Sequence, residues 1–393
     1  MKDVVIIANF VAGLQGRDNN RFSYLATLLS KDCNVELVAS NFNHGEKKKR
    51  ESIADYPFKV TLLDEPGYSK NICLKRFWSH YIWGRNVISY LKKRKKPDVI
   101  YCAVPSLTAP ALVSDYCKKE NIRFIIDVQD LWPEAFMMVL NVPVVSKVLF
   151  SPFTYLANKI YKNADEIVAV SETYVSRALE GNKTIKEAHT VFLGTNLDVF
   201  DDFSVKNKKE FDSSEIKLVY CGTLGSSYDL TSVFDSMRIL ENMGISNIRF
   251  IVMGDGPRKK EFMNSAQGLK VEFLGRLPYD QMCGILCSCD ISVNPIRSKA
   301  AQSIINKHAD YAAAGIPVIN TQECVEYREM IKTYNMGFNC ENENAGDMAE
   351  KIKILVENDE LRRNMGSNSR LCAEKLFDRK QTYCELVNLI LAE

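Results

Sequence analysis

The fold is decided by one stretch in the second half of the chain, residues 302–319, which reads QSIINKHADYAAAGIPVI. A polar loop is followed by a helix of small residues over 306–314, a stop at Gly315 and a buried strand over 317–319. A helix that leads directly into a buried strand is one repeat of a parallel α/β sheet. The stretch therefore predicts a parallel sheet covered by helices.

The same alternation extends from this stretch in both directions. Short apolar runs alternate with segments of helical period, as in parallel sheets whose faces are covered by helices. The expected strands of the first half are 4–8, 34–39, 98–102, 123–126 and 166–170, with helices over 21–30, 78–92 and 110–120. The expected strands of the second half are 217–221, 248–253, 271–273, 291–293 and 317–319, with helices over 230–243 and 306–314.

Length sets the number of domains. At roughly 150 residues per domain, 393 residues predict two or three domains that each bury a core. The alternation breaks in a polar, charged segment at 201–215, which we expect to be a linker. We predict an α/β chain of two doubly wound, Rossmann-like domains over 1–200 and 216–378 that face a cleft, with a helix over 379–393 that crosses back to the first domain.

Charge and cysteine content exclude several classes of function. With 51 Lys and Arg against 49 Asp and Glu, the formal charge of +2 provides no overall attraction to nucleic acid. The 12 Cys are scattered and no secretory segment precedes them, so we expect a cytoplasmic, reducing environment. Cys283, Cys287 and Cys289 form the only cluster but lack the spacing of a zinc site. No apolar run is long enough to cross a bilayer.

Doubly wound sheets often bind dinucleotides through G-x-G-x-x-G after the first strand. Gly13 and Gly16 follow the first expected strand, and they do not complete this fingerprint. Gly254 and Gly256 follow a later strand, where Pro257 interrupts the pattern. The sequence therefore disfavours nicotinamide and flavin oxidoreductases.

The helix of the 302–319 stretch begins like an anion site. Ser303 is the expected N-cap, and the free N–H groups that follow it would face an anion such as a diphosphate. Lys307 and Asp310 are three residues apart and share one face of the helix. The lysine offers positive charge, and the carboxylate can accept two ribose hydroxyls. An exposed ion pair between the two is the alternative.

The stretch resembles the nucleotide-binding signature of retaining glycosyltransferases of family 4, which have the glycosyltransferase-B fold. That signature carries one Glu and then, after seven residues, a second Glu followed by A-x-A-x-G-x-P-V. Here the position of the second Glu is occupied by Asp310, and the position of the first Glu is occupied by Gln302. Residues 306–315 resemble the version found in a subgroup that acts in bacterial surface-polysaccharide assembly. Further matches in the same order are 127–134, 164–172, 193–198, 222–225, 254–257 and 273–277, so the resemblance covers nearly the whole chain.

The resemblance implies a nucleotide-sugar donor, which we expect to carry UDP, and transfer with retention that uses no metal and no cofactor. The implied donor-binding residues are Gly16, Gly225, Ser226, Gly254, Arg276, Leu277, Ser303, Ile304, Ile305, Asn306 and Asp310. Many family members hold the diphosphate with an Arg and a Lys after the first strand of the second domain, whereas 222–229 contains neither. We therefore expect Lys307 to supply this charge as a catalytic residue. Gln302, the second expected catalytic residue of this domain, can hydrogen-bond the sugar but carries no charge.

On the first domain the resemblance points to the loop 127–134. Asp130 is the expected catalytic residue that orients the acceptor hydroxyl, with a helix cap as the alternative. Gln129, Trp132 and Glu134 are the expected acceptor contacts. The basic run 92–96 follows an aromatic-rich helix, and such a pair can rest on anionic headgroups; a solvated helix end is the alternative. Relatives in the subgroup use polyprenyl-diphosphate sugars, which implies peripheral association with the inner face of the cell membrane.

The leading hypothesis is a hexosyl- or N-acetylhexosaminyltransferase that moves a sugar from a UDP-linked donor to a lipid-linked glycan in capsule, O-antigen or exopolysaccharide synthesis. One alternative is a UDP-sugar 2-epimerase on the same fold, which would need more acid and base groups than the four histidines of the chain offer. Another is a non-catalytic partner subunit that binds nucleotide or glycan. Gln302 and the missing cations of 222–229 keep that second alternative open.

Overall fold

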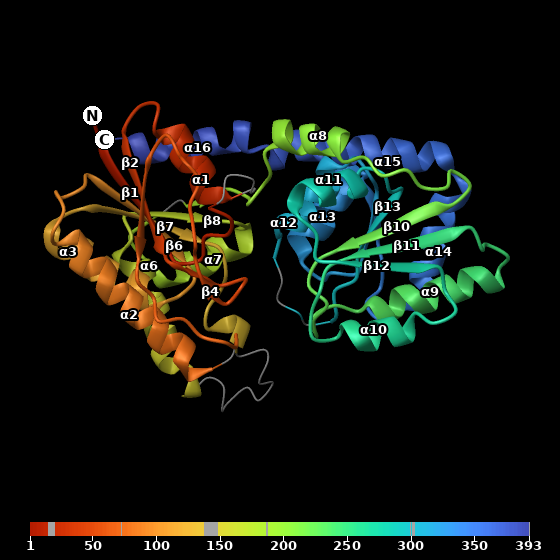
Figure 1. Cartoon of the computed structure of the whole chain (residues 1–393), viewed down its shortest axis with the longest axis horizontal. Helices are drawn as coiled ribbons and strands as arrows, with labels where there is room; N and C mark the ends of the chain where they lie inside the picture. The colour runs from red at the N-terminus through yellow and green to blue at the C-terminus, as the bar shows by residue number, and fades with distance from the viewer. Residues whose placement is uncertain are drawn as a thin grey trace. The chain divides into compact units, whose positions relative to one another are not determined.

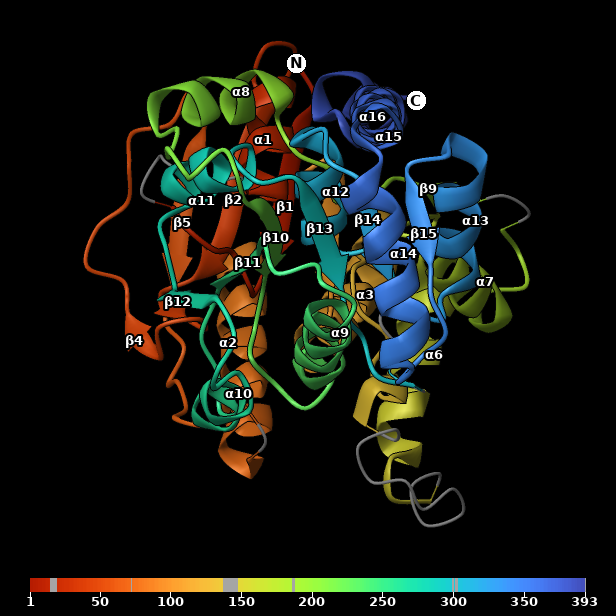
Figure 2. The same ribbon diagram turned by 90° about the vertical axis from the view of Figure 1, so that its right-hand side faces the viewer.

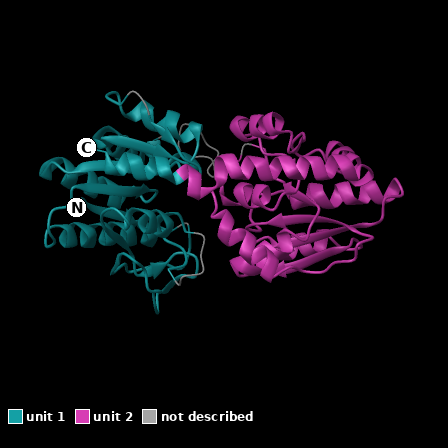
Figure 3. Ribbon diagram, turned by 90° about the horizontal axis from the view of Figure 1, so that it is seen from above, with its two compact units in different colours: residues 1–192, 383–393 teal, residues 193–382 magenta. Residues whose placement is uncertain are grey.

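The structure is a computed structural model that describes residues 1–14, 20–71, 73–136, 148–185, 188–298, 300 and 303–392. The chain divides into two compact units (Figure 3): Met1–Phe192 with Tyr383–Glu393, and Leu193–Thr382. Each unit is built on a parallel sheet of its own (Figure 1). The chain thus enters the second unit at residue 193 and returns to the first within its last helix.

The sheet of the first unit has the order β5-β2-β1-β6-β7-β8-β9, and every neighbouring pair is parallel. In its register, Ile6 of β1 lies beside Leu37 of β2 and Tyr101 of β6. The strands are β1 (Asp3–Ala8), β2 (Asn34–Ser40), β5 (Lys59–Leu63), β6 (Val99–Val104), β7 (Arg123–Val128), β8 (Glu166–Ala169) and β9 (His189–Thr190). A separate antiparallel hairpin consists of β3 (Phe42–Asn43) and β4 (Lys48–Lys49).

Helices cover this sheet, which is why its central strands are mostly apolar. They are α1 (Arg21–Leu29), α2 (Leu74–Leu91), α3 (Thr108–Glu120), α6 (Ser151–Asn163), α7 (Glu172–Gly181) and the part of α16 (Arg379–Leu391) from Tyr383 on. Arg21 ties the end of the chain to the sheet. Its guanidinium donates to the buried Asp127 carboxylate at 2.8 Å and to Tyr383 Oη at 2.9 Å.

The sheet of the second unit has the order β12-β11-β10-β13-β14-β15, again parallel throughout. The strands are β10 (Ile216–Cys221), β11 (Ile248–Met253), β12 (Val271–Gly275), β13 (Ile291–Asn294), β14 (Val318–Asn320) and β15 (Gly337–Asn339). The helices are α8 (Leu197–Lys206), α9 (Leu230–Asn242), α10 (Lys259–Ser265), α11 (Tyr279–Leu286), α12 (Asn306–Ala313), α13 (Val325–Tyr334), α14 (Ala345–Glu357) and α15 (Asp359–Cys372), which continues into a π-helical turn (Ala373–Phe377). α9 and α14 pack side by side (Figure 2).

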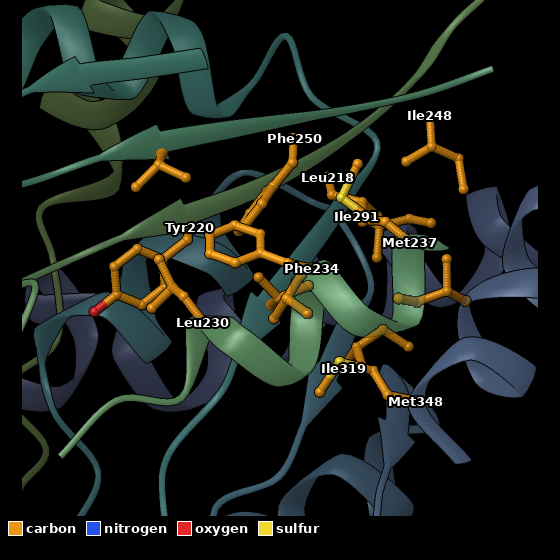
Figure 4. Packing of buried hydrophobic residues seen from close by; sticks show 14 of the residues in the cluster. Leu218, Tyr220, Leu230, Phe234, Met237, Ile248, Phe250, Ile291, Ile319 and Met348 are labelled. Carbon is orange, nitrogen blue, oxygen red and sulfur yellow. The ribbon is translucent and has the colours of Figure 1, made fainter. Parts of the chain in front are cut away.

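The main core of the second unit lies between α9, α14 and the sheet. Phe234 and Met237 of α9 point among Leu218, Phe250 and Ile291 of the strands (Figure 4), and all five side chains are buried. The rings of Phe234 and Phe250 are 6.0 Å apart. Each such side chain contributes about 1.5–3 kcal/mol by burial. This core holds the strand ends on which the functional loops depend.

The expected strands and helices are present, with some ends displaced by a few residues; α2, for example, begins at Leu74 and not at Trp78. β5, β9, β15 and the β3–β4 hairpin were not expected. β5 is an edge strand of half-buried residues, and β15 has only three residues, so neither has the long apolar run of a central strand.

The segment 201–215 is not a linker between the units, because it lies inside the second one. Its first residues end helix α8, which packs on α11. The contact is tight, since a Cβ on Gly284 of α11 would lie 1.9 Å from Asn207 O. Polar composition suggested a linker, but the buried faces of α8 at Leu197 and Phe200 decide its position.

Candidate functional site

The carboxyl edge of the second sheet has a point where the strand order reverses. β11 and β12 lie on one side of β10, and β13, β14 and β15 lie on the other. The connections that follow β10 and β13 therefore leave in opposite directions, and ligands of doubly wound sheets bind in the crevice between such connections. Here the borders of that crevice are the loop 222–229 after β10 and residues 295–298 and 303–305 after β13.

Glycines bring the loops after β10 and β11 into direct contact. Gly254 has a φ of +153°, and a Cβ there would lie 1.8 Å from Gly222 O. A Cβ on Gly256 would lie 2.4 Å from Leu224 O. Only glycine permits this approach, which leaves the backbone beside Gly225 free of bulky neighbours. Such glycine-rich turns at strand ends let backbone N–H groups approach a phosphate.

The loop after β10 is joined to the connection after β13. Arg297 N–H donates to Ser227 O at 3.0 Å, and Asp229 N–H donates to Pro295 O at 2.8 Å. Tyr228 forms an isolated antiparallel bridge with Ile296. The two borders of the crevice are therefore held together by backbone hydrogen bonds.

Lys307, in the first turn of α12, is the most unusual residue of this region. Its side chain is buried, and the ammonium lies 5.1 Å from the ring centre of Tyr220 and 4.4 Å from that of Tyr228. Among the described residues its Nζ has no hydrogen-bond partner. Burial lowers its pKa to about 7. A buried cation that only aromatic faces touch is costly, and an anionic ligand would repay that cost.

Three more buried polar atoms, at the end of β13 and in the residues that follow it, have no hydrogen-bond partner in the described part of the chain. They are Asn294 Oδ1, Arg297 Nε and Ser303 Oγ. Buried polar groups are nearly always satisfied in folded proteins, so a local group of exceptions indicates a ligand position. The end of β13, the connection after it and the first turn of α12 therefore carry an amide, a guanidinium, a hydroxyl and an ammonium that each have an unsatisfied atom among the described residues.

Asp310 is one turn after Lys307 and has a different environment. It is buried, and its Oδ1 accepts a hydrogen bond from Tyr279 Oη at 2.8 Å, while Tyr279 Oη lies 2.8 Å from Thr195 Oγ1. Burial raises its pKa to about 6, against the opposing effect of the Tyr279 hydrogen bond. The alternative of an exposed Lys307–Asp310 ion pair is wrong, because both groups are buried and each has other neighbours.

The prediction that Ser303 caps this helix is also wrong. α12 begins at Asn306 after an extended Ile305, and the ring of His308 provides the cap: its Nδ1 accepts from Ile305 N–H at 2.8 Å. With Nδ1 as acceptor, His308 Nε2 carries the proton and donates to Gln322 Oε1 at 2.9 Å. Burial, with the charge of Lys307, lowers the pKa of His308 to about 3, so the ring is neutral.

The other expected donor residues that the structure describes lie at the same edge of the second sheet. Ser226 and Arg276 are exposed, and Leu277 is half-buried just after β12. Ile304 is buried, whereas Asn306 is exposed at the start of α12. Gly16 and Gln302 lie outside the described residues.

The expected acceptor residues lie after β7, at the carboxyl edge of the first sheet. Asp130 accepts from Trp132 Nε1 at 3.0 Å, and burial raises its pKa above the ordinary value. Gln129 Nε2 donates to Asp127 at 2.9 Å. Glu134 forms an ion pair with Arg177, so this carboxylate is already engaged.

The basic run and the exposed aromatics are not neighbours. Residues 92–96 follow the end of α2, whereas Leu74 (87% exposed) and Trp78 (52% exposed) are at its beginning. At 1.5 Å per residue, the 18 residues of α2 separate its ends by about 27 Å. Within the basic run, Arg94 is also engaged, in ion pairs with Asp3 and Glu36.

Several residues of the site escape sequence reasoning. Tyr220 and Tyr228 meet Lys307 from the other side of the strand reversal, and Tyr279 reaches Asp310 from α11. Tyrosines at the ends of strands and in glycine-rich loops are the only signal, and it does not say which helix they will meet.

In the described part of the chain, no group of three His, Cys, Asp or Glu residues is placed to hold a metal ion. None of the helices described is long and apolar enough to span a membrane. A cavity of about 430 Å³ in the second unit lies at the opposite edge of the sheet, near Lys217, Asp290 and Pro317, and is remote from the crevice.

Comparison with solved structures defines the class of fold. The chain is similar to sucrose-phosphate synthase from Thermosynechococcus elongatus, with a TM-score of 0.77, 15% identity and coverage of 99% of this chain and 98% of that one. It is similar to HepE of Anabaena in complex with UDP (TM-score 0.70, 14% identity, 99% of each chain) and to WaaG, a glycosyltransferase involved in lipopolysaccharide biosynthesis (0.69, 14%, 99% and 100%). The protein has the glycosyltransferase-B fold.

Within that class, residues 201–371 match the family of glycosyl transferases group 1. The segment includes the whole crevice and α12. An uncharacterised glycosyltransferase of Methanocaldococcus jannaschii is 25% identical over 216 residues, which are 54% of this chain and 56% of that protein. The match therefore spans about half the length of this curated relative.

Proposed function

We propose that the protein is a retaining glycosyltransferase that transfers a hexosyl or N-acetylhexosaminyl group from a UDP-sugar to a lipid-linked glycan in surface-polysaccharide synthesis. The observation that carries the proposal is the buried ammonium of Lys307 at the strand reversal, for which the described residues provide no hydrogen-bond partner. A nucleoside diphosphate supplies the missing negative charge at that position. The match of 201–371 to glycosyl transferases group 1 supports the same class of donor.

In the proposed reaction, Lys307 binds the diphosphate and stabilises it as the bond to the sugar breaks. Ser303 Oγ and Arg297 Nε, in the connection after β13, are assigned as further donors. Asp310, held by Tyr279, accepts hydroxyls of the ribose or the sugar. Catalysis then consists of positioning and leaving-group stabilisation, with no metal and no cofactor in the proposal.

The acceptor hydroxyl is assigned to Asp130 at the carboxyl edge of the first sheet. This carboxylate is held by the Trp132 indole, and burial raises its pKa. In a retaining transfer on one face of the sugar, an oxygen of the leaving diphosphate takes the proton of the acceptor. Asp130 therefore orients the hydroxyl, and it does not need to be the final base.

The decisive experiment measures thermal unfolding of the purified chain with UDP, GDP, ADP and dTDP, followed by release of sugar from the corresponding nucleotide sugars. We expect stabilisation by UDP and slow hydrolysis of a UDP-sugar. Lys307→Met should remove both responses. The matched control is Lys353→Met, which changes an exposed lysine of α14 and should keep both.

The other outcomes of this experiment would identify a different function or exclude the donor site. Stabilisation by a diphosphate with no turnover of its sugars would identify a non-catalytic binding subunit. Conversion of the UDP-sugar into its 2-epimer without release would identify an epimerase. If no nucleoside diphosphate shifts the unfolding temperature, the donor site is refuted.

We also propose peripheral association with the inner face of the cell membrane through the start of α2. Leu74 and Trp78 are exposed there beside the exposed Lys75, and Tyr155 of α6 is 68% exposed. Apolar and cationic side chains together suit an anionic headgroup region. Flotation with phosphatidylglycerol vesicles tests this, since Leu74→Ser with Trp78→Ser should reduce binding and high salt should weaken it.

The control for this surface replaces Lys92 and Lys96, at the far end of α2, with Gln. If only this control variant loses flotation, the membrane contact is assigned to the basic run 92–96 instead of the start of α2. No flotation of the unmodified protein at low ionic strength would contradict membrane association.

A further inference from the structure

A second group of cations, for which the described residues provide no carboxylate partner, lies in the first unit, at the carboxyl edge of its sheet. We call it the cation–aromatic cluster and define it by Phe10, Lys47, Tyr68, Arg76 and Trp132. The five residues come from the ends of β1 and β7, the β3–β4 hairpin, the segment after β5 and the first turn of α2. Five separate parts of the unit thus converge on one point.

Arg76 forms the floor of the cluster. It is 7% exposed, and its guanidinium lies 4.6 Å from the Trp132 ring centre, 5.5 Å from Phe10 and 5.7 Å from Tyr68. Its Nη1 donates to Asn71 O at 2.7 Å, but its Nε has no hydrogen-bond partner among the described residues. Burial lowers its pKa, against the raising effects of Tyr68, which also hydrogen-bonds the guanidinium, and of the Asp130 charge.

Lys47 forms part of the rim. Its backbone has a φ of +59°, an unusual conformation for a residue with a side chain, which the hairpin imposes. The ammonium lies 5.0 Å from the Tyr68 ring centre and donates to His44 O at 2.6 Å. Burial, together with the nearby Arg76, lowers its pKa. Two cations therefore share one aromatic ring.

The carboxylates nearby do not neutralise these cations. Glu65 is buried and accepts from Asn9 at 2.9 Å and from Ser79 at 2.8 Å, as well as from Ser40. Asp130 accepts from Trp132 Nε1 and influences Arg76 only as a neighbouring charge. In the described part of the chain, neither Arg76 nor Lys47 has a carboxylate within ion-pair distance.

Two histidines beside the cluster are neutral and add no compensation. Tyr68 Oη contacts the rings of both His44 and His80. Burial and the charges of Arg76 and Lys47 lower the pKa of His44 to about 4 and that of His80 to about 3. The local charge is therefore positive, and Phe10, His44 and Lys47 are only half-buried, so the cluster is accessible from solvent.

We propose that the cation–aromatic cluster binds a phosphate group, with Arg76 Nε and the Lys47 ammonium as its donors. This phosphate site rests on the proposed function, and we assign its phosphate to the acceptor substrate. Trp132 makes the connection, because one face of its indole lies against Arg76 and its Nε1 donates to Asp130. The acceptor is then held by its phosphate at one side of Trp132 while its hydroxyl is oriented at the other.

Histidine NMR tests the proposal directly, because the chain has only four histidines. Inorganic phosphate bound at the cluster should shift the ring signals of His44 and His80 and raise the pKa of His44, since it neutralises the two cations that lower it. His189, which pairs with Glu385, should not move. His308, next to Lys307, reports the donor site separately.

The variants are Lys47→Gln and Arg76→Gln, with Lys48→Gln as the matched control on the exposed side of the same hairpin. Each of the first two should weaken phosphate binding about tenfold, as expected when a charge-assisted hydrogen bond is lost. The control should bind as the unmodified protein does. Lys47 is half-buried at the rim, so its variant keeps the test valid if Arg76→Gln fails to fold.

Glucose 6-phosphate and farnesyl diphosphate distinguish the two sources of phosphate. Tighter binding of glucose 6-phosphate than of inorganic phosphate supports a soluble acceptor, and tighter binding of farnesyl diphosphate supports a lipid-linked one. If neither exceeds inorganic phosphate, the acceptor role is overturned.

The proposal fails if saturating phosphate leaves His44 unmoved, or if Lys48→Gln weakens binding as much as Lys47→Gln. Failure of the proposed function has a different signature, namely an unchanged His308 on addition of every nucleoside diphosphate. The experiment is repeated in Lys307→Met, where the His44 response to phosphate should persist.

Discussion

Replacing Lys307 with methionine should stabilise the ligand-free protein and abolish its response to nucleoside diphosphates. The pKa of Lys307 falls from the ordinary 10.5 to about 7 because the side chain is buried. At ~1.4 kcal/mol per pKa unit, the buried charge costs up to about 5 kcal/mol. The rings of Tyr220 and Tyr228 return ~1–2 kcal/mol as cation–π contacts. We therefore expect Lys307→Met to raise the unfolding free energy by about 3 kcal/mol where the lysine is charged.

The increase in unfolding free energy caused by Lys307→Met depends on pH in a defined way. Below pH 7 the lysine is protonated in both the folded and the unfolded state, so the whole cost is present. Between pH 7 and 10.5 the folded protein loses this proton while the unfolded chain keeps it, and stability rises with pH. The advantage of methionine should therefore be largest near pH 6 and clearly smaller near pH 9.

Thermal unfolding near pH 6, 7.5 and 9, with and without UDP, is the appropriate assay. For a unit of this size, about 3 kcal/mol corresponds to an increase of roughly 6–12 °C near pH 6. UDP should protect the unmodified protein less as pH rises above 7, because binding then requires uptake of a proton by Lys307. Lys353→Met serves as the control at each pH.

Two results would refute this reasoning. One is a Lys307→Met protein that is less stable than the original near pH 6. The other is a stability difference that does not change with pH. Either would mean that the ammonium has a compensating partner or remains solvated, and the argument for an anion site at α12 would lose its basis.

Asp310→Asn should raise the thermal unfolding temperature at pH 7.5 but not near pH 3.5: the folded pKa of about 6 exceeds the ordinary 3.8, so the cost of the carboxylate is absent below pH 3.8, grows between pH 3.8 and 6 and is complete above pH 6. The same variant should bind UDP-sugar more weakly in calorimetry. Gly254→Ala should cost more than about 4 kcal/mol in denaturant unfolding, since its Cβ would lie 1.8 Å from a backbone oxygen, whereas Gly268→Ala, with open space, should cost only ~1–2 kcal/mol. Tyr383→Phe removes the 2.9 Å hydrogen bond from Arg21 and should cost about 1–3 kcal/mol; equal proteolytic release of the C-terminal segment from both proteins would argue against it.

The central strands could be predicted to within one or two residues. β1, β2, β7, β10 and β11 are mostly apolar, because helices cover both faces of each sheet and burial on both faces favours apolar residues at most positions. The short edge strands could not be predicted from the sequence, since only part of their surface is buried. The segment 201–215, which we expected to be a linker, shows the same limit of sequence-based prediction. A polar segment can end a packed helix when two apolar side chains of that helix are buried.

The position of the proposed donor site was also within reach of the sequence. Lys307 and Asp310 were singled out by their spacing and by the resemblance of the stretch around them. Their actual partners were not, because the rings of Tyr220 and Tyr228 and the hydroxyl of Tyr279 come from distant elements. The capping role of His308 was missed because an imidazole acceptor replaced the expected serine hydroxyl.

By itself the sequence determined the alternation of strands and helices, the two sheets and the stretch to which we assign the proposed donor site, because hydrophobic period and glycine placement are local properties. Only the tertiary structure decided the charge states. The pKa of Lys307 moves down and that of Asp310 moves up because strands, loops and a helix far apart in the chain remove water from both. The cation–aromatic cluster has the same origin: desolvation depends on neighbours in space, and no local pattern records it.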